Sequence, residues 1–116
     1  MPKNNTLTSP PNSFLTAVFL ADTNFADSYT KYNFLDGTFT YLGMNIKQEY
    51  NYFLIDNIGT GKIRFSVNRP DIDLSAPVYG AKTLKPGDAI YFEEDVWHIS
   101  IYYIEDSSVE VVLKYE

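Results

Sequence analysis

The last third of the chain alternates between apolar and polar side chains, and this period of two constrains the fold more than any other feature. Apolar residues occupy every second position from Trp97 to Tyr103, and again from Val109 to Tyr115. A third segment, 62–68, alternates in the same way. Successive side chains of a β-strand point to opposite faces, so this spacing predicts strands that each bury one face.

Weaker strand and turn signals fill the chain from residue 38 onward. Further strands are expected at 38–42, 45–57 and 89–93. Strands that recur about every 8–12 residues with little helix between them are typical of an antiparallel sandwich or barrel. We therefore predict an all-β fold, an antiparallel β-sandwich that is either jelly-roll-like or closed into a small barrel.

Glycine and proline mark the turns between these strands. Gly59 and Gly61 predict a tight turn that joins the strand 45–57 directly to the strand 62–68. Pro86-Gly87 predicts a β-turn, because proline presets φ at the second position and glycine tolerates the positive φ that follows in a type II turn. Residues 68–82, with two prolines and a glycine, form a long loop of the kind that often binds partners.

The first third of the chain differs from the rest. We assign 1–37 to an N-terminal arm, partly extended or flexible, and 38–116 to the β-sandwich domain. Residues 14–19 fit both a helical stripe and a buried strand. Many aromatic residues with weak periodicity would suit an arm that docks on a neighbouring protein, although an irregular first strand pair or ordinary core residues would look the same. The predicted partner-binding residues are Phe14, Phe19, Phe25, Tyr29, Tyr32 and Phe34, with Tyr79 in the long loop.

Charge and composition exclude several classes of function. Nine Lys and Arg against 15 Asp and Glu give a net charge of −6, and because such a field repels polyanions we expect no nucleic-acid partner. The apolar runs are far shorter than the roughly 20 residues of a membrane span, and no apolar segment follows Lys3 as it would in a signal peptide. We therefore expect no membrane insertion. The chain has no cysteine, which removes disulfides and thiolate chemistry.

The stretch from Pro86 to His98 contains the only histidine of the chain and resembles half of a cupin metal site. A cupin site draws about three imidazoles and a carboxylate from two motifs, and transition metals need several such ligands. On the strand pattern His98 lies opposite Ile99 and Ile101, so we expect an exposed histidine beside Ser100. Residues two apart on a strand lie about 7 Å from one another, beyond hydrogen-bond reach. We predict no metal, no cofactor and no catalytic residue.

A series of strand and turn motifs runs from Tyr52 to Glu116. It comprises "YFLIDN", "IRFSVN" after a glycine-rich turn, "LKPGDAIYF" after a linker, and "SSVEVVL" at the end. This order resembles that of small virion proteins of tailed bacteriophages, which are β-sandwiches used as capsid decoration, head–tail or tail accessory subunits. The resemblance implies a non-enzymatic structural component of a bacteriophage virion that is synthesised in the host cytoplasm. It implies assembly as a homo-oligomer, through the arm and β edges, onto capsid, portal or tail proteins.

Two other functions fit the same sequence. A carbohydrate-binding β-sandwich module would hold a host-surface glycan on an aromatic platform, for which the candidates are Tyr50, Tyr52, Tyr91 and Tyr102. A cupin-like small-molecule-binding protein or enzyme would instead use the stretch around His98.

Overall fold

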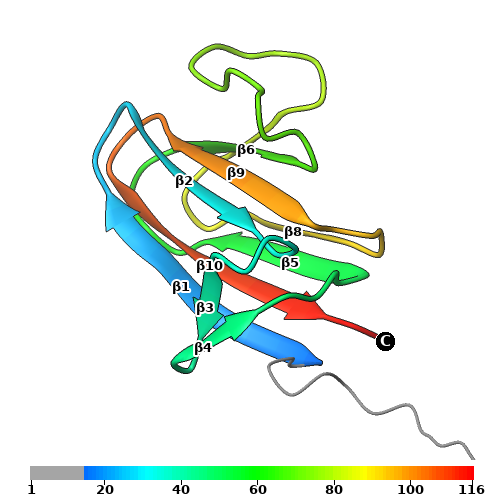
Figure 1. Cartoon of the computed structure of the whole chain (residues 1–116). Helices are drawn as coiled ribbons and strands as arrows, with labels where there is room; N and C mark the ends of the chain where they lie inside the picture. The colour runs from blue at the N-terminus through cyan, green and yellow to red at the C-terminus, as the bar shows by residue number, and fades with distance from the viewer. Residues whose placement is uncertain (1–14) are drawn as a thin grey trace, which may run out of the picture.

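The computed structural model describes residues 15–116, and every regular element in this range is a strand. The strands are β1 (Thr16–Asn24), β2 (Ser28–Asn33), β3 (Phe39–Tyr41), β4 (Met44–Ile46), β5 (Tyr52–Asn57), β6 (Ile63–Val67), β7 (Lys82–Leu84), β8 (Ala89–Phe92), β9 (His98–Tyr103) and β10 (Ser107–Lys114). Figure 1 shows two facing layers of strands, with the β3–β4 hairpin across one end. The prediction of an all-β sandwich is confirmed.

The order of the strands identifies the sandwich as a jelly roll. In the described part of the chain one four-stranded sheet has the order β1-β10-β5-β8, and the other has the order β2-β9-β6-β7. Every paired strand in these two sheets is antiparallel. Among the eight strands of these two sheets, the chain changes sheet at each connection except β6–β7, which gives the eight-stranded double-sheet arrangement of a jelly roll. Of the two predicted forms, the jelly-roll-like sandwich is therefore the correct one.

The hydrophobic core lies between the two sheets. On β10 buried and partly buried residues alternate along the whole strand, as the period of two predicts. Val109, Val111 and Leu113 of β10 have no exposed surface and face Ile99 and Ile101 of β9 in one continuous core. At the β3–β4 end this core is closed by aromatic rings, among which the Phe34 ring lies 4.9 Å from that of Phe39, edge to face.

The glycine-rich connection after β5 is not a hairpin turn. The predicted strand 45–57 divides into β4 and β5, and β5 and β6 belong to different sheets. Gly59 and Gly61 serve another purpose here. A Cβ atom on Gly61 would lie 2.3 Å from the Asp106 carbonyl oxygen, and one on Gly59 would lie 2.2 Å from Ser107 Oγ. The two glycines thus let the β5–β6 connection pack directly on the β9–β10 turn.

The sandwich begins at residue 16, not at residue 38. Residues 16–33, predicted as part of an arm, form β1 and β2, which are edge strands of the two sheets. Strand β1 buries Ala17 and Ala21 but also exposes Val18 and Leu20. A strand that is apolar on both faces does not show a period of two, which is why its sequence left helix and strand open. The strand interpretation of this segment is the correct one.

Candidate interaction surface

The predicted partner-binding residues occupy different environments in the structure. Phe14 lies outside the described residues. Phe19 and Tyr32 are partly buried against the core. Phe34 has no exposed surface, so the prediction that it contacts a partner is wrong, and the alternative of an ordinary core residue applies. The exposed members are Phe25 at 77%, Tyr29 at 36% and Tyr79 at 96%.

The predicted glycan platform does not form as a set of four rings. Tyr50 and Tyr102 are buried, and burial raises the pKa of the Tyr50 hydroxyl to about 12 because the charged form loses its water. Tyr52 and Tyr91 remain at the surface, where their rings stack with centroids 6.0 Å apart. The two surface rings are thus half of the platform that the sequence predicted.

The long loop 68–81 covers the outer face of the β2-β9-β6-β7 sheet. Arg64 on this face is buried and donates from Nη1 to the Leu74 carbonyl oxygen at 2.6 Å. Ser66 donates from Oγ to the Gly80 carbonyl oxygen at 3.0 Å. The loop also packs apolar side chains of its own onto the sheet, with Leu74 fully buried beside Tyr102. The loop 68–81 therefore covers the outer face of this sheet, one of the two outer sheet faces of the sandwich.

His98 is buried under this cover, so the expectation of an exposed strand histidine is wrong. It does lie on the face of β9 opposite Ile99 and Ile101, but its residual exposure is 4%. Its backbone N–H donates to Asn68 Oδ1 at 3.2 Å. Within residues 15–116 neither His98 Nδ1 nor Ser100 Oγ has a hydrogen-bond partner, so the two side chains are not joined as a base and a nucleophile would be.

We expect the free energy of unfolding to fall as the pH drops below about 6.5, the ordinary pKa of histidine. Burial lowers the pKa of His98, the positive charge of Lys31 lowers it further, and Asp36 and Asp71 oppose the shift. Above that pH the imidazole is neutral in both states. Below it the unfolded chain takes up the proton first and is favoured. Urea titrations between pH 7 and pH 5 should show that the free energy of unfolding falls less for His98→Gln than for the natural chain. An equal fall in the two proteins would contradict the contribution of His98 to this pH dependence.

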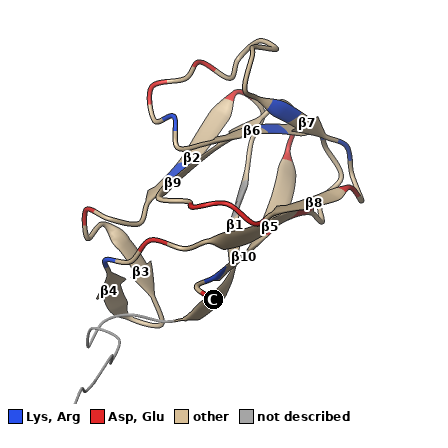
Figure 2. Ribbon diagram, turned by 90° about the vertical axis from the view of Figure 1, so that its right-hand side faces the viewer, with Lys and Arg blue, Asp and Glu red and all other residues tan. Residues whose placement is uncertain are grey.

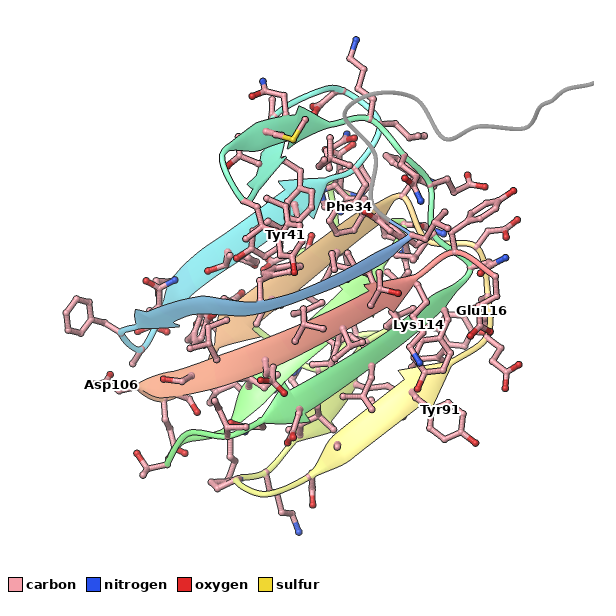
Figure 3. The ribbon with its side chains drawn as sticks, turned by 90° about the horizontal axis from the view of Figure 1, so that it is seen from below. Phe34, Tyr41, Tyr91, Asp106, Lys114 and Glu116 are labelled. Carbon is pink, nitrogen blue, oxygen red and sulfur yellow. The ribbon has the colours of Figure 1, made fainter. Side chains whose placement is uncertain are left out.

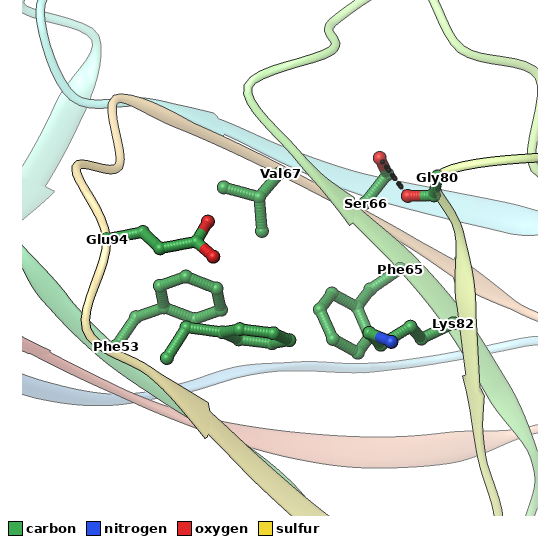
Figure 4. A pocket seen from close by; sticks show the side chains of 8 residues that line it. Phe53, Phe65, Ser66, Val67, Gly80, Lys82 and Glu94 are labelled. Atoms are coloured by element: carbon green, nitrogen blue, oxygen red, sulfur yellow. Dashed lines mark hydrogen bonds between the residues drawn. The ribbon is translucent and has the colours of Figure 1, made fainter.

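A small cavity opens between the two sheets at their β7 and β8 edges (Figure 4). Its volume is about 170 Å³, and the rings of Phe53, Phe65 and Phe92 line it together with the charged Lys82 and Glu94. Sites for drug-sized ligands usually measure roughly 300–1,000 Å³. The cavity is therefore smaller than such a site, and its aromatic lining packs with the core.

The outer face of the β1-β10-β5-β8 sheet carries an apolar row that crosses its four strands. Backbone pairing aligns Val18 with Val112, Val112 with Leu54, and Leu54 with Tyr91. Val18 and Tyr91 are 45% and 60% exposed, and Figure 3 looks onto this face with Tyr91 at its β8 edge. We call these four residues the apolar row. Leu20, further along β1, extends the exposed apolar area. Large exposed apolar patches are typical of surfaces that bind proteins or other ligands.

Charged residues of opposite sign lie on the two sides of the apolar row. Glu110 and Asp56 are paired in register on one side, and Lys114 and Tyr52 are paired on the other. Lys114 Nζ lies 5.0 Å from the centroid of the Tyr52 ring, in cation–π contact. Figure 2 shows acidic and basic residues distributed over the strands and loops of the whole molecule. On this face the acidic residues Glu110 and Asp56 lie towards one end of the strands and the basic residue Lys114 lies towards the other end.

Sequence reasoning missed the apolar row because its four members are far apart in the chain and only the pairing register aligns them. The signal that could have found it is Val112, an apolar residue in the polar phase of an alternating strand, between Glu110 and Lys114. Leu54 interrupts the polar phase of β5 in the same way.

The described residues include no helix of the length and apolarity that a membrane crossing would need. Nor do residues 15–116 bring together three or more His, Asp or Glu side chains that could hold a metal ion.

The solved structures that are similar to this chain include two of the Tobacco streak virus coat protein. No protein-family model matches the chain, and no curated protein matches it. A structure of the Tobacco streak virus coat protein is 11% identical, covers 94% of this chain and 90% of its own, and has a TM-score of 0.42. A structure of the Tobacco streak virus coat protein dimer is 12% identical, covers 95% of this chain and 91% of its own, and has a TM-score of 0.39.

Proposed function

We propose that this chain is a non-enzymatic structural component of a virion, and specifically of a bacteriophage virion. In this proposal it is synthesised in the host cytoplasm and assembles onto capsid, portal or tail proteins. The observation that carries the proposal is the apolar row, because an exposed apolar sheet face is suited to contact with another protein surface. The jelly roll is compatible with the proposal, and viral capsid, lectin and cupin domains all use it.

Three exposed aromatic residues give the proposal further contact points. Phe25 lies in the β1–β2 connection, and Tyr79 lies in the loop 68–81. The Tyr29 hydroxyl accepts the Leu74 N–H at 2.8 Å, so its ring also borders that loop. Large aromatic side chains are enriched at the centres of protein interfaces. We therefore propose these residues as contacts with neighbouring virion proteins.

The stacked pair of Tyr52 and Tyr91 supports a second candidate function, a carbohydrate-binding module for a host-surface glycan. Aromatic faces at a surface can pack on the apolar face of a sugar ring. A glycan array discriminates between the two functions. Binding that disappears in Tyr91→Ala would favour the module, and an array without signal would favour the assembly role.

Quantitative mass spectrometry of purified particles tests the proposed function. Particles from infected cells are banded on a density gradient, and the copy number of this chain is measured against the major capsid protein. We expect a fixed ratio that persists through a second gradient. If the chain stays in the lysate while intact particles band without it, the proposed function is wrong.

A further inference from the structure

We propose that the outer face of the β1-β10-β5-β8 sheet binds a second copy of this chain, with the two-fold axis lying along the apolar row. The inference deepens the proposed function, on which it rests for taking this face as an assembly surface. A second copy is the partner because a two-fold rotation about the row brings the acidic residues of one copy opposite the basic residues of the other.

Rotation about an axis along the apolar row reverses the strand direction of the second copy. The row then meets its own equivalent, so that Val112 lies against Val112 of the other copy. The charged positions exchange sides, and Glu110 of each copy therefore comes to face Lys114 of the other. Along β10 these two residues flank Val112 at about 7 Å on either side, given the rise of a strand, so both pairs form together. Two sheets that pack face to face in this way keep their strands nearly aligned.

The alternative axis, parallel to the strands and midway between β10 and β5, gives the opposite result. It would place Glu110 of one copy against Asp56 of the other, since these residues are paired in register on neighbouring strands. Two such pairs of carboxylates would then meet side by side on the acidic side of the row, and like charges in an interface are unfavourable. The charges on this face thus select the axis along the apolar row.

The size of the face sets the strength that we expect. From the spacing of strands and the rise along β10, it measures about 500 Å² per copy. The total of about 1,000 Å² is at the low end of specific interfaces, so the dimer should be reversible, with a Kd of about 1–100 μM.

Charge reversal tests both the dimer and its axis. Within one chain Glu110 and Lys114 lie four residues apart on a strand, about 14 Å, so neither can pair with the other in the monomer. We expect Glu110→Lys alone and Lys114→Glu alone each to weaken self-association at least about tenfold, because each creates two like-charge contacts per dimer. An equimolar mixture of the two variants should associate as tightly as the natural chain, since every contact in the mixed dimer is of opposite sign.

Sedimentation velocity on the full chain between 1 and 200 μM measures these associations. Asp71→Lys, which makes the same change of charge on the loop over the opposite sheet, should leave the Kd unchanged, and circular dichroism should show the same fold for each variant. Stronger association of Glu110→Lys alone would overturn the axis. A natural chain that stays monomeric at 200 μM would overturn the dimer, and its presence in purified particles would still uphold the proposed function.

Discussion

Phe34→Ala is expected to lower the free energy of unfolding by about 4 kcal/mol, the usual range for a fully buried aromatic ring. The ring lies edge to face against Phe39, and against Tyr50 at a centroid distance of 5.8 Å. Its backbone is fixed on both sides, because Phe34 N–H donates to the Trp97 carbonyl oxygen and Gln48 N–H donates to the Phe34 carbonyl oxygen, each at 2.8 Å. This fixed backbone limits how far the surroundings can relax into the cavity. Urea unfolding, followed by the fluorescence of Trp97, gives the value.

Phe25→Ala is the matched control for this change. It removes the same side chain from the same region of the sequence, but from a position that is 77% exposed. We expect its effect on the free energy of unfolding to stay within about 0.5 kcal/mol. If the two variants were equally stable, Phe34 would not be part of the core, and the original interpretation of it as a partner contact would return.

Asn57→Ala should cost about 3 kcal/mol of unfolding free energy, because it leaves buried polar groups without partners. The side chain is fully buried at the end of β5. Its Nδ2 donates to the Gly61 carbonyl oxygen at 2.8 Å and to the Leu84 carbonyl oxygen at 3.1 Å, and its Oδ1 accepts from Ser107 Oγ at 2.8 Å. This one amide therefore ties the β5–β6 connection to β7 in the opposite sheet and to β10.

Asn51→Ala provides the comparison. The Asn51 amide makes two side-chain hydrogen bonds, to the backbone N–H and carbonyl oxygen of Glu116, each at 2.9 Å. These bonds are exposed, so water replaces them when the side chain is removed, and the expected cost is below about 1 kcal/mol. Thermal unfolding of the two variants side by side measures the difference. Equal melting temperatures would contradict the structural role assigned to Asn57.

The strands of the C-terminal third could be predicted because each obeys one local rule. The alternation of β10 follows from its own residues, and so does the turn at Pro86-Gly87, where Gly87 has a φ of +87°. What could not be predicted depends on distant partners. Whether the connection after β5 makes a hairpin or crosses to the other sheet is decided by its close contact with the β9–β10 turn. That contact appears in the sequence only as two glycines.

The burial of His98 shows the same limit at the level of a single side chain. Its face of the strand was predicted correctly, but its exposure depends on the loop 68–81 lying over that face. The loop contains Ile72 and Leu74, which the sequence placed in an irregular segment and which the structure buries against Tyr102. Strand alternation assigns a side chain to a face of a sheet, and the segments that cover each face are set by the fold as a whole.

The loop over the β2-β9-β6-β7 sheet also determines how far association can continue. A sandwich with two bare faces could add copies on both sides and grow into a stack without an end. Here one side is already occupied by the chain's own backbone and apolar side chains, whereas within residues 15–116 the other sheet face exposes Val18, Leu20 and Tyr91. When two copies associate through this face, each copy buries its exposed face, so this mode of association stops at a dimer. Any larger assembly must grow through other surfaces, such as the edge strands and the loop 68–81 with its exposed Tyr79.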